Sequence, residues 1–73
     1  MSEITYKITR PIAVLSETEK GYTIEANMMI WNDGEEKLDI RHWHPEHKKC
    51  SRGITLTEDE GRKLLEALKK LYK

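Results

Sequence analysis

Apolar and polar residues alternate along much of the chain, a pattern typical of β-strands with one buried face. Near the start, Ile4, Tyr6 and Ile8 share one parity, and this alternation predicts a first strand at about residues 3–16. Pro11 lies within it. Because proline cannot donate to a strand ladder, Pro11 indicates an edge position, a bulge or a break.

A polar turn leads to a second alternating run, which predicts a strand at about residues 21–32. Its odd positions begin polar and end with Met29 and Trp31, so that face is amphipathic. Its even positions are mostly apolar, and we expect them to face the core: Tyr22, Ile24, Ala26, Met28 and Ile30.

Residues 32–34 (Asn-Asp-Gly) are a strong turn signal and predict a hairpin to a third strand at about residues 37–43. We expect Leu38 and Ile40 to point to the core. The other parity points away from the core: Lys37, Asp39, Arg41 and Trp43. After a basic loop that contains histidines, a short fourth strand is predicted at about residues 53–56.

The last segment predicts one helix at about residues 58–72, because its leucines repeat at helical spacing. Thr57 and Glu60 are spaced as a capping box, which favours a helix start at this point. The apolar stripe is wide for one helix on so small a sheet, and it contains Leu64, Leu65, Leu68, Leu71 and Tyr72. We expect part of this stripe to be a dimer interface; burial within one chain is the alternative.

These elements predict an α+β fold in a single domain, residues 1–73: four antiparallel strands followed by one C-terminal helix. A domain this small buries little apolar surface and usually needs a disulfide, a metal or a partner chain. Cys50 is the only cysteine, so a disulfide within the chain is excluded. The lone cysteine and the lack of a recognisable signal sequence favour a cytoplasmic protein, and no apolar run suggests a membrane partner.

The formal net charge is zero, but the charges are unevenly distributed. Residues 37–52 contain five basic and two acidic side chains together with all three histidines. This segment is either ordinary solvated surface or a basic patch, and the sequence leaves both open.

The face of the central hairpin turned away from the expected core is the first functional candidate. It combines aromatic, cationic and polar residues: Asn27, Met29, Trp31, Lys37, Arg41 and Trp43. Unpaired bases stack on indole rings at roughly 1–3 kcal/mol each, while cations contact the phosphates. The alternative is that both tryptophans pack beneath the helix or a loop.

Two further candidates are weaker. Three histidines and Cys50 fall within residues 42–50, but the paired spacing typical of zinc sites is missing, so we expect no metal and no cofactor. A thiol and His47 alone do not make a nucleophilic site, and no other catalytic constellation is evident, so we expect no enzyme activity.

Three short motifs, in this order and spacing, resemble a known family. They are Val-Leu-Ser at 14–16 with Lys-Gly at 20–21, Asp-Ile-Arg-His-Trp at 39–43, and Arg-Gly-Ile-Thr-Leu-Thr at 52–57. From about Ile12 to Leu71 the chain is similar to the positive-cofactor-four family of transcriptional coactivators, and most similar to its short bacterial members of the YdbC type.

The resemblance implies a curved sheet, a two-fold homodimer joined through its helices, and single-stranded DNA binding with little sequence preference. RNA is a second possible ligand. Arg41 and Arg52 match basic positions of the family, Trp43 and His44 match the aromatic end of its third strand, and Trp31 lies near an aromatic of its second strand. The expected phosphate contacts are Lys20, Lys37, Arg41, Lys48, Lys49 and Arg52, beside stacking by Trp31 and Trp43 and lesser contacts by Asn27, Met29 and His44.

The chain departs from the family in two respects. Gly61 stands where the family usually has a bulky aromatic residue, and the Ser/Lys-rich tail of the eukaryotic coactivators is absent. These departures favour a bare DNA-binding module over a promoter coactivator. A protein-interaction module that uses the aromatic face or the edge strand near Pro11 is the competing hypothesis.

Overall fold

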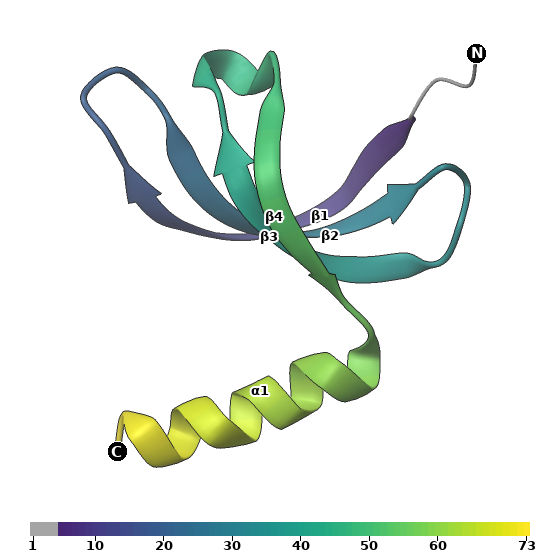
Figure 1. The fold of residues 1–73 in the computed structure, drawn as a ribbon, viewed down its shortest axis with the longest axis vertical. Helices are drawn as coiled ribbons and strands as arrows, with labels where there is room; N and C mark the ends of the chain where they lie inside the picture. Colours follow the sequence, from purple (N-terminus) through teal and green to yellow (C-terminus); the bar gives the residue numbers. More distant parts are fainter. Residues whose placement is uncertain (1–4) are drawn as a thin grey trace.

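The computed structural model describes residues 5–73 as a four-stranded antiparallel sheet followed by one helix (Figure 1). The strands lie side by side in chain order. The elements are β1 (Tyr6–Glu17), β2 (Thr23–Trp31), β3 (Glu36–Trp43), a short 3-10 turn η1 (Pro45–His47), β4 (Cys50–Leu56) and α1 (Glu58–Leu71). The predicted α+β arrangement is confirmed. Residues 3 and 4 of the predicted first strand, including Ile4, lie outside the described residues.

The turn between β2 and β3 is the predicted hairpin. Asn32 and Asp33 have φ values of 50° and 59°, and the Gly34 amide donates to the Trp31 carbonyl over 2.9 Å. Asn and Asp tolerate this left-handed geometry better than most residues do, which explains the local sequence. At the other hairpin, β1 shifts register against β2 at three points, one of them between Pro11 and Ala13. Pro11 therefore lies in an edge strand beside a bulge.

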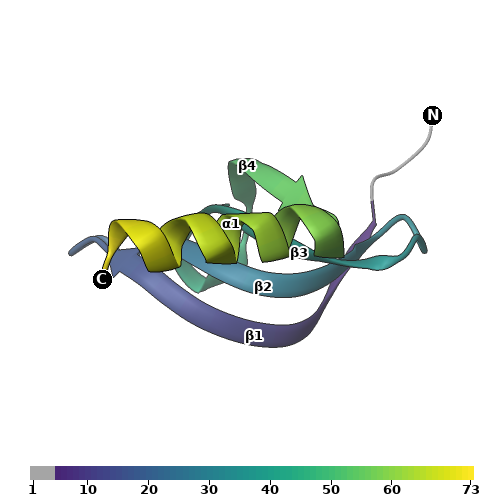
Figure 2. The ribbon, with the colours of Figure 1, turned by 90° about the horizontal axis from the view of Figure 1, so that it is seen from below.

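The sheet is strongly curved. Both ends of the strands rise away from α1, and β1 and β2 are bowed in the same direction (Figures 1 and 2). Tyr6 pairs with Trp31 at one end of β2 and Trp43 pairs with Thr23 at the other end, yet the Tyr6 and Trp43 rings are 5.6 Å apart. Bulges increase local twist, so the three shifts in β1 favour this curvature.

We call the two sides of the curved sheet the concave face and the convex face. The concave face contains Glu25, Asn27, Met29, Trp31, Asp39, Arg41 and Trp43. The convex face, which is turned toward α1, contains Ile24, Ala26, Met28, Ile30, Leu38 and Ile40.

The core of the single chain lies on the concave face, so our prediction that the even positions form the core was wrong for one chain. Met29 and Trp43 are 0% exposed and Asn27 is 3% exposed, whereas Ala26 is the one convex-face residue in the buried class among residues 5–73. Curvature brings the concave side chains together and spreads the convex ones apart. We expected Asn27, Met29 and Trp43 to be exposed for nucleic-acid binding, but the structure buries all three.

α1 begins as predicted and then leaves the sheet. The Thr57 hydroxyl accepts from the Glu60 amide over 3.2 Å, and the Glu60 carboxylate accepts from the Thr57 amide over 2.8 Å, which completes the capping box. The leucine stripe stays exposed, from 38% at Leu64 to 67% at Leu71. No helix among the described residues is both long and apolar enough to cross a membrane.

Candidate nucleic-acid interface

An aromatic cluster fills the concave face. The Trp43 ring contacts Tyr6 on one side and His47 on another, with the His47 ring 4.6 Å away at an interplanar angle of 32°. Trp31 lies 5.3 Å from Tyr6 and is only half-buried. The two tryptophans share one face, as predicted, but Trp43 is sealed by Tyr6 and the η1 segment rather than by the helix. In this conformation Trp31 is accessible to a ligand and Trp43 is not.

The buried indole of Trp43 lacks a partner. Its Nε1 atom makes no hydrogen bond with any of residues 5–73. A buried donor left unsatisfied costs roughly 1–3 kcal/mol, and such groups are rare in folded proteins.

A buried carboxylate organises the neighbouring part of this face. Asp39 is 0% exposed and accepts from Arg41 Nε over 2.6 Å, Arg41 Nη2 over 2.8 Å and Thr55 Oγ1 over 2.8 Å. It also accepts from Trp31 Nε1 over 3.3 Å. The guanidinium of Arg41 lies 4.6 Å from the centre of the Trp31 ring. Asp39 thus fixes a cation against an aromatic ring, an attractive arrangement in itself.

Arg41 is largely occupied inside the protein. The hydrogen bonds that Arg41 donates to the Asp39 carboxylate raise the pKa of Arg41, and Arg41 Nη1 donates to the Ser51 carbonyl over 3.0 Å. Gly53 pairs with Arg41, and a Cβ atom on Gly53 would lie only 2.1 Å from the Arg41 Cβ. Glycine therefore lets β4 pass beneath the arginine. This geometry makes Arg41 a residue that positions Trp31 and leaves it few donors for phosphate.

Glu25 and His47 form a second polar contact on the concave face. His47 Nε2 lies 2.8 Å and 3.0 Å from the two carboxylate oxygens of Glu25. An ionised carboxylate only accepts, so Nε2 carries the proton. Burial raises the pKa of Glu25, but hydrogen bonds from Thr23, His47 and Asn27 outweigh burial and hold the pKa below its ordinary value.

The other members of the histidine loop lie apart. His44 Nε2 is 3.2 Å from the Ser51 hydroxyl, and His42 is exposed beside Ile24 on the convex side. Cys50 is a free, half-buried thiol. Among residues 5–73, no group of three or more His, Cys, Asp or Glu side chains is arranged to hold a metal ion.

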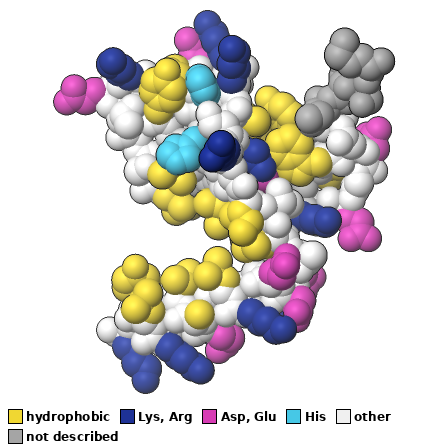
Figure 3. All heavy atoms as spheres, viewed as in Figure 1, with side chains coloured by type: hydrophobic (Ala, Val, Ile, Leu, Met, Phe, Trp, Pro, Cys, Tyr) yellow, Lys and Arg dark blue, Asp and Glu magenta, His cyan; other side chains and the backbone are white. Residues whose placement is uncertain are grey.

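Exposed cations gather at one end of the sheet. The β1–β2 turn packs against η1, since a Cβ on Gly21 would lie 3.3 Å from Pro45 Cβ. This packing puts the turn that carries Lys20 next to the loop that carries Lys48 and Lys49. Lysine, arginine and histidine side chains share this part of the surface with hydrophobic ones (Figure 3). Of the predicted phosphate contacts, Lys20, Lys48, Lys49 and Arg52 are exposed and Lys37 is half-buried.

Sequence reasoning missed Tyr22 at the same end. We expected Tyr22 in the core, but it is 41% exposed and its ring lies 5.1 Å from that of His44. The signal was its position just before β2 and next to a turn, where the alternation of the strand does not fix the direction of a side chain. Tyr6, 41% exposed beside Trp31, was likewise assigned to the core parity.

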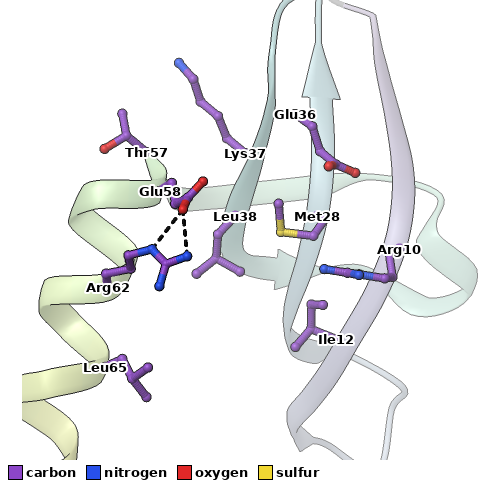
Figure 4. A pocket seen from close by; sticks show the side chains of 11 residues that line it. Arg10, Ile12, Met28, Glu36, Lys37, Leu38, Thr57, Glu58, Arg62 and Leu65 are labelled. Carbon is purple, nitrogen blue, oxygen red and sulfur yellow. Dashed lines mark hydrogen bonds and ion pairs between the residues drawn. The ribbon is translucent and has the colours of Figure 1, made fainter.

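The convex face and α1 enclose an open hollow. A cavity of about 500 Å³ separates them, with Leu38 of β3 and Leu65 of α1 pointing into it (Figure 4). Hydrophobic side chains line both sides of this hollow (Figure 3). Gly61 also borders the cavity, so no side chain fills the place where a bulky aromatic was expected from the family.

Comparisons with known proteins give a relative but no function. No protein-family model matches the chain. An uncharacterized protein of Treponema pallidum (strain Nichols) is 40% identical over 55 residues, which cover 75% of this chain. The matched region spans 65% of the length of that protein.

Proposed function

We propose that this protein binds single-stranded DNA with little sequence preference and does so as a two-fold homodimer. The observation that carries the proposal is the half-buried Trp31 ring, held by Asp39 and backed by the Arg41 guanidinium at 4.6 Å. A fixed and partly exposed indole is a surface on which any base can stack, since every base has a π-face.

The charge distribution supports a strand that runs along this face. Lys20, Lys48, Lys49 and Arg52 are exposed near the β3–β4 end of the sheet, and Tyr22 and His44 offer a second pair of rings among them. Cations that contact phosphates release counterions, so affinity should depend steeply on salt although the net charge of the chain is zero.

The apolar side chains that one chain leaves exposed on α1 support the proposed dimer. Leu65 is 49% exposed, Leu68 40% and Leu71 67%, and all lie on a helix that makes few contacts with the sheet. Small monomeric domains rarely leave such a stripe in water. A second copy related by a two-fold axis would cover the stripe and the adjoining hollow, and would leave both concave faces free.

The competing hypothesis of a protein-interaction module gains less from the structure. Its expected docking edge, β1, carries three register shifts and Pro11. Bulges and prolines are the devices by which edge strands avoid pairing with another chain.

Titration with oligo-dT at two salt concentrations tests the proposal, with double-stranded DNA and oligo-U as competitors. We expect binding that weakens about tenfold or more between low and physiological salt, with tryptophan fluorescence quenched on binding. Arg52→Glu and Lys48→Glu should weaken it, whereas Lys63→Glu on the helix should not. Salt-independent titration with unchanged fluorescence would reject DNA binding. Preference for oligo-U would make RNA the ligand.

A further inference from the structure

The loop of residues 44–49 covers Trp43 through His47, while its first residues are also held by the packing of Pro45 on Gly21 and by His44 Nε2, which lies 3.2 Å from the Ser51 hydroxyl. The loop is closed at its base by the His44 amide, which donates to the Lys49 carbonyl over 2.9 Å. Above the base, the ring of His47 stacks on Trp43 at 4.6 Å. The contact that fixes this ring is the one between His47 Nε2 and Glu25, at 2.8 Å and 3.0 Å to the two oxygens.

The covered state carries two unfavourable features. Glu46 and His47 both have φ of 58°, the left-handed region that non-glycine residues seldom adopt. The Trp43 indole N–H is buried without an acceptor among the described residues. Opening the loop would relieve the backbone strain and would let the indole donate a hydrogen bond.

The His47 ring occupies the place that a ligand ring would take. It is a flat, polar heterocycle that lies against the indole at an interplanar angle of 32°, on a ring where an unpaired nucleobase could stack. Its side chain is 44% exposed, so solvent reaches the outer side of the stack. Lys48 and Lys49 follow directly in the same loop and are exposed.

We infer that the 44–49 loop is a lid over a second base-binding site on Trp43, latched by the His47–Glu25 contact. On opening, an unpaired base replaces the imidazole on the indole, and Trp43 Nε1 donates to an oxygen of the nucleic acid. This inference rests on the proposed function and extends it, because it returns to the interface a tryptophan that the closed structure hides.

The two tryptophans allow a direct test, since each contributes one indole N–H signal to an NMR spectrum of the intact protein. Trp31→Phe identifies the Trp43 signal. We expect oligo-dT to shift that signal. We also expect His47→Ala to speed its exchange with solvent and to tighten oligo-dT binding roughly three- to tenfold, because the population already open rises. Glu25→Gln weakens the latch from the other side and should act in the same direction.

His42→Ala is the matched control, because the His42 side chain is exposed on the convex side, opposite the face that carries Trp43 and the His47–Glu25 contact. It should change neither exchange nor affinity. Oligo-dT binding that leaves the Trp43 signal in place, or a Trp43 N–H equally protected in folded His47→Ala, overturns the lid alone. Absence of any oligo-dT binding by the unaltered protein overturns the proposed function and the lid together.

Discussion

The two faces of the sheet differ in how far the single chain buries their side chains. On the concave face, Trp43, Met29 and Asp39 are 0% exposed, and aromatic rings and hydrogen bonds fill the space between strands. On the convex face, apolar residues of the sheet and of α1 face each other across a cavity of about 500 Å³. A single chain thus covers one face by its own curvature and leaves the other largely uncovered. This difference is why we propose ligand binding and self-association on opposite sides of the sheet.

The largest effect should follow from breaking the concave network at its centre. Asp39→Ala leaves the partly buried guanidinium of Arg41 without its carboxylate, and removing one partner of such a pair costs about 3–5 kcal/mol. Urea denaturation should show a large loss of unfolding free energy or an unfolded chain. Arg62→Gln, which breaks an exposed helix pair with Glu58, should cost less than about 0.5 kcal/mol. Equal costs for both variants would mean that the network does not support the fold.

Breaking the convex side should affect association before it affects the fold of the concave side. Leu68→Lys puts a charge into the exposed leucine stripe, and we expect the dimer to weaken at least tenfold because about 1.5–3 kcal/mol of apolar burial is lost per leucine. Leu65→Lys should behave alike. Sedimentation equilibrium measures the mass, with Lys70→Gln as the control. An unchanged mass in both leucine variants would reject the helix as the interface.

Acid should weaken the concave face through Glu25. Its pKa in the folded chain is lowered from the ordinary value of 4.5, so the ionised form is favoured by folding. The stability it contributes is present above that ordinary value and is lost in the acidic range below it, as pH falls through the lowered pKa. Glu25→Gln should cost about 1–3 kcal/mol at neutral pH and flatten this part of the pH profile.

Denaturation midpoints measured across that range provide the check. Glu66→Gln, which changes an exposed carboxylate on α1, should keep the pH profile of the unaltered protein. If Glu25→Gln kept the acid-dependent loss in full, another carboxyl group would be responsible for it.

The smallest effect that we predict is a gain in stability from a substitution on the convex side. Gly61→Ala should stabilise the protein by up to about 1 kcal/mol through helix propensity, because the added Cβ would lie an ordinary 3.8 Å from the nearest Leu38 atom. The thermal midpoint should rise by a few degrees. A fall would instead show that a side chain of the second copy occupies the space next to Gly61, and would sharpen the description of the interface.

Local patterns determined most of the architecture. Alternation located the strands, the Asn-Asp-Gly turn fixed the β2–β3 hairpin, and Thr57 with Glu60 set the start of the helix. The same alternation placed Trp31, Arg41 and Trp43 on one side of the sheet, which the strand register confirms. These features depend on neighbours in sequence, so sequence alone is enough to read them.

Which side of the sheet becomes the core of one chain was decided by tertiary structure. Alternation defines two faces of the sheet but not the direction in which the sheet bends. The direction of bending decides which face becomes concave and packs into the core. It brings Tyr6 of β1 against Trp43 of β3, and it buries Asp39 with Arg41 above Gly53 of β4. The Tyr6–Trp43 and Arg41–Gly53 contacts join residues far apart in the chain, and no local pattern of hydrophobicity encodes them.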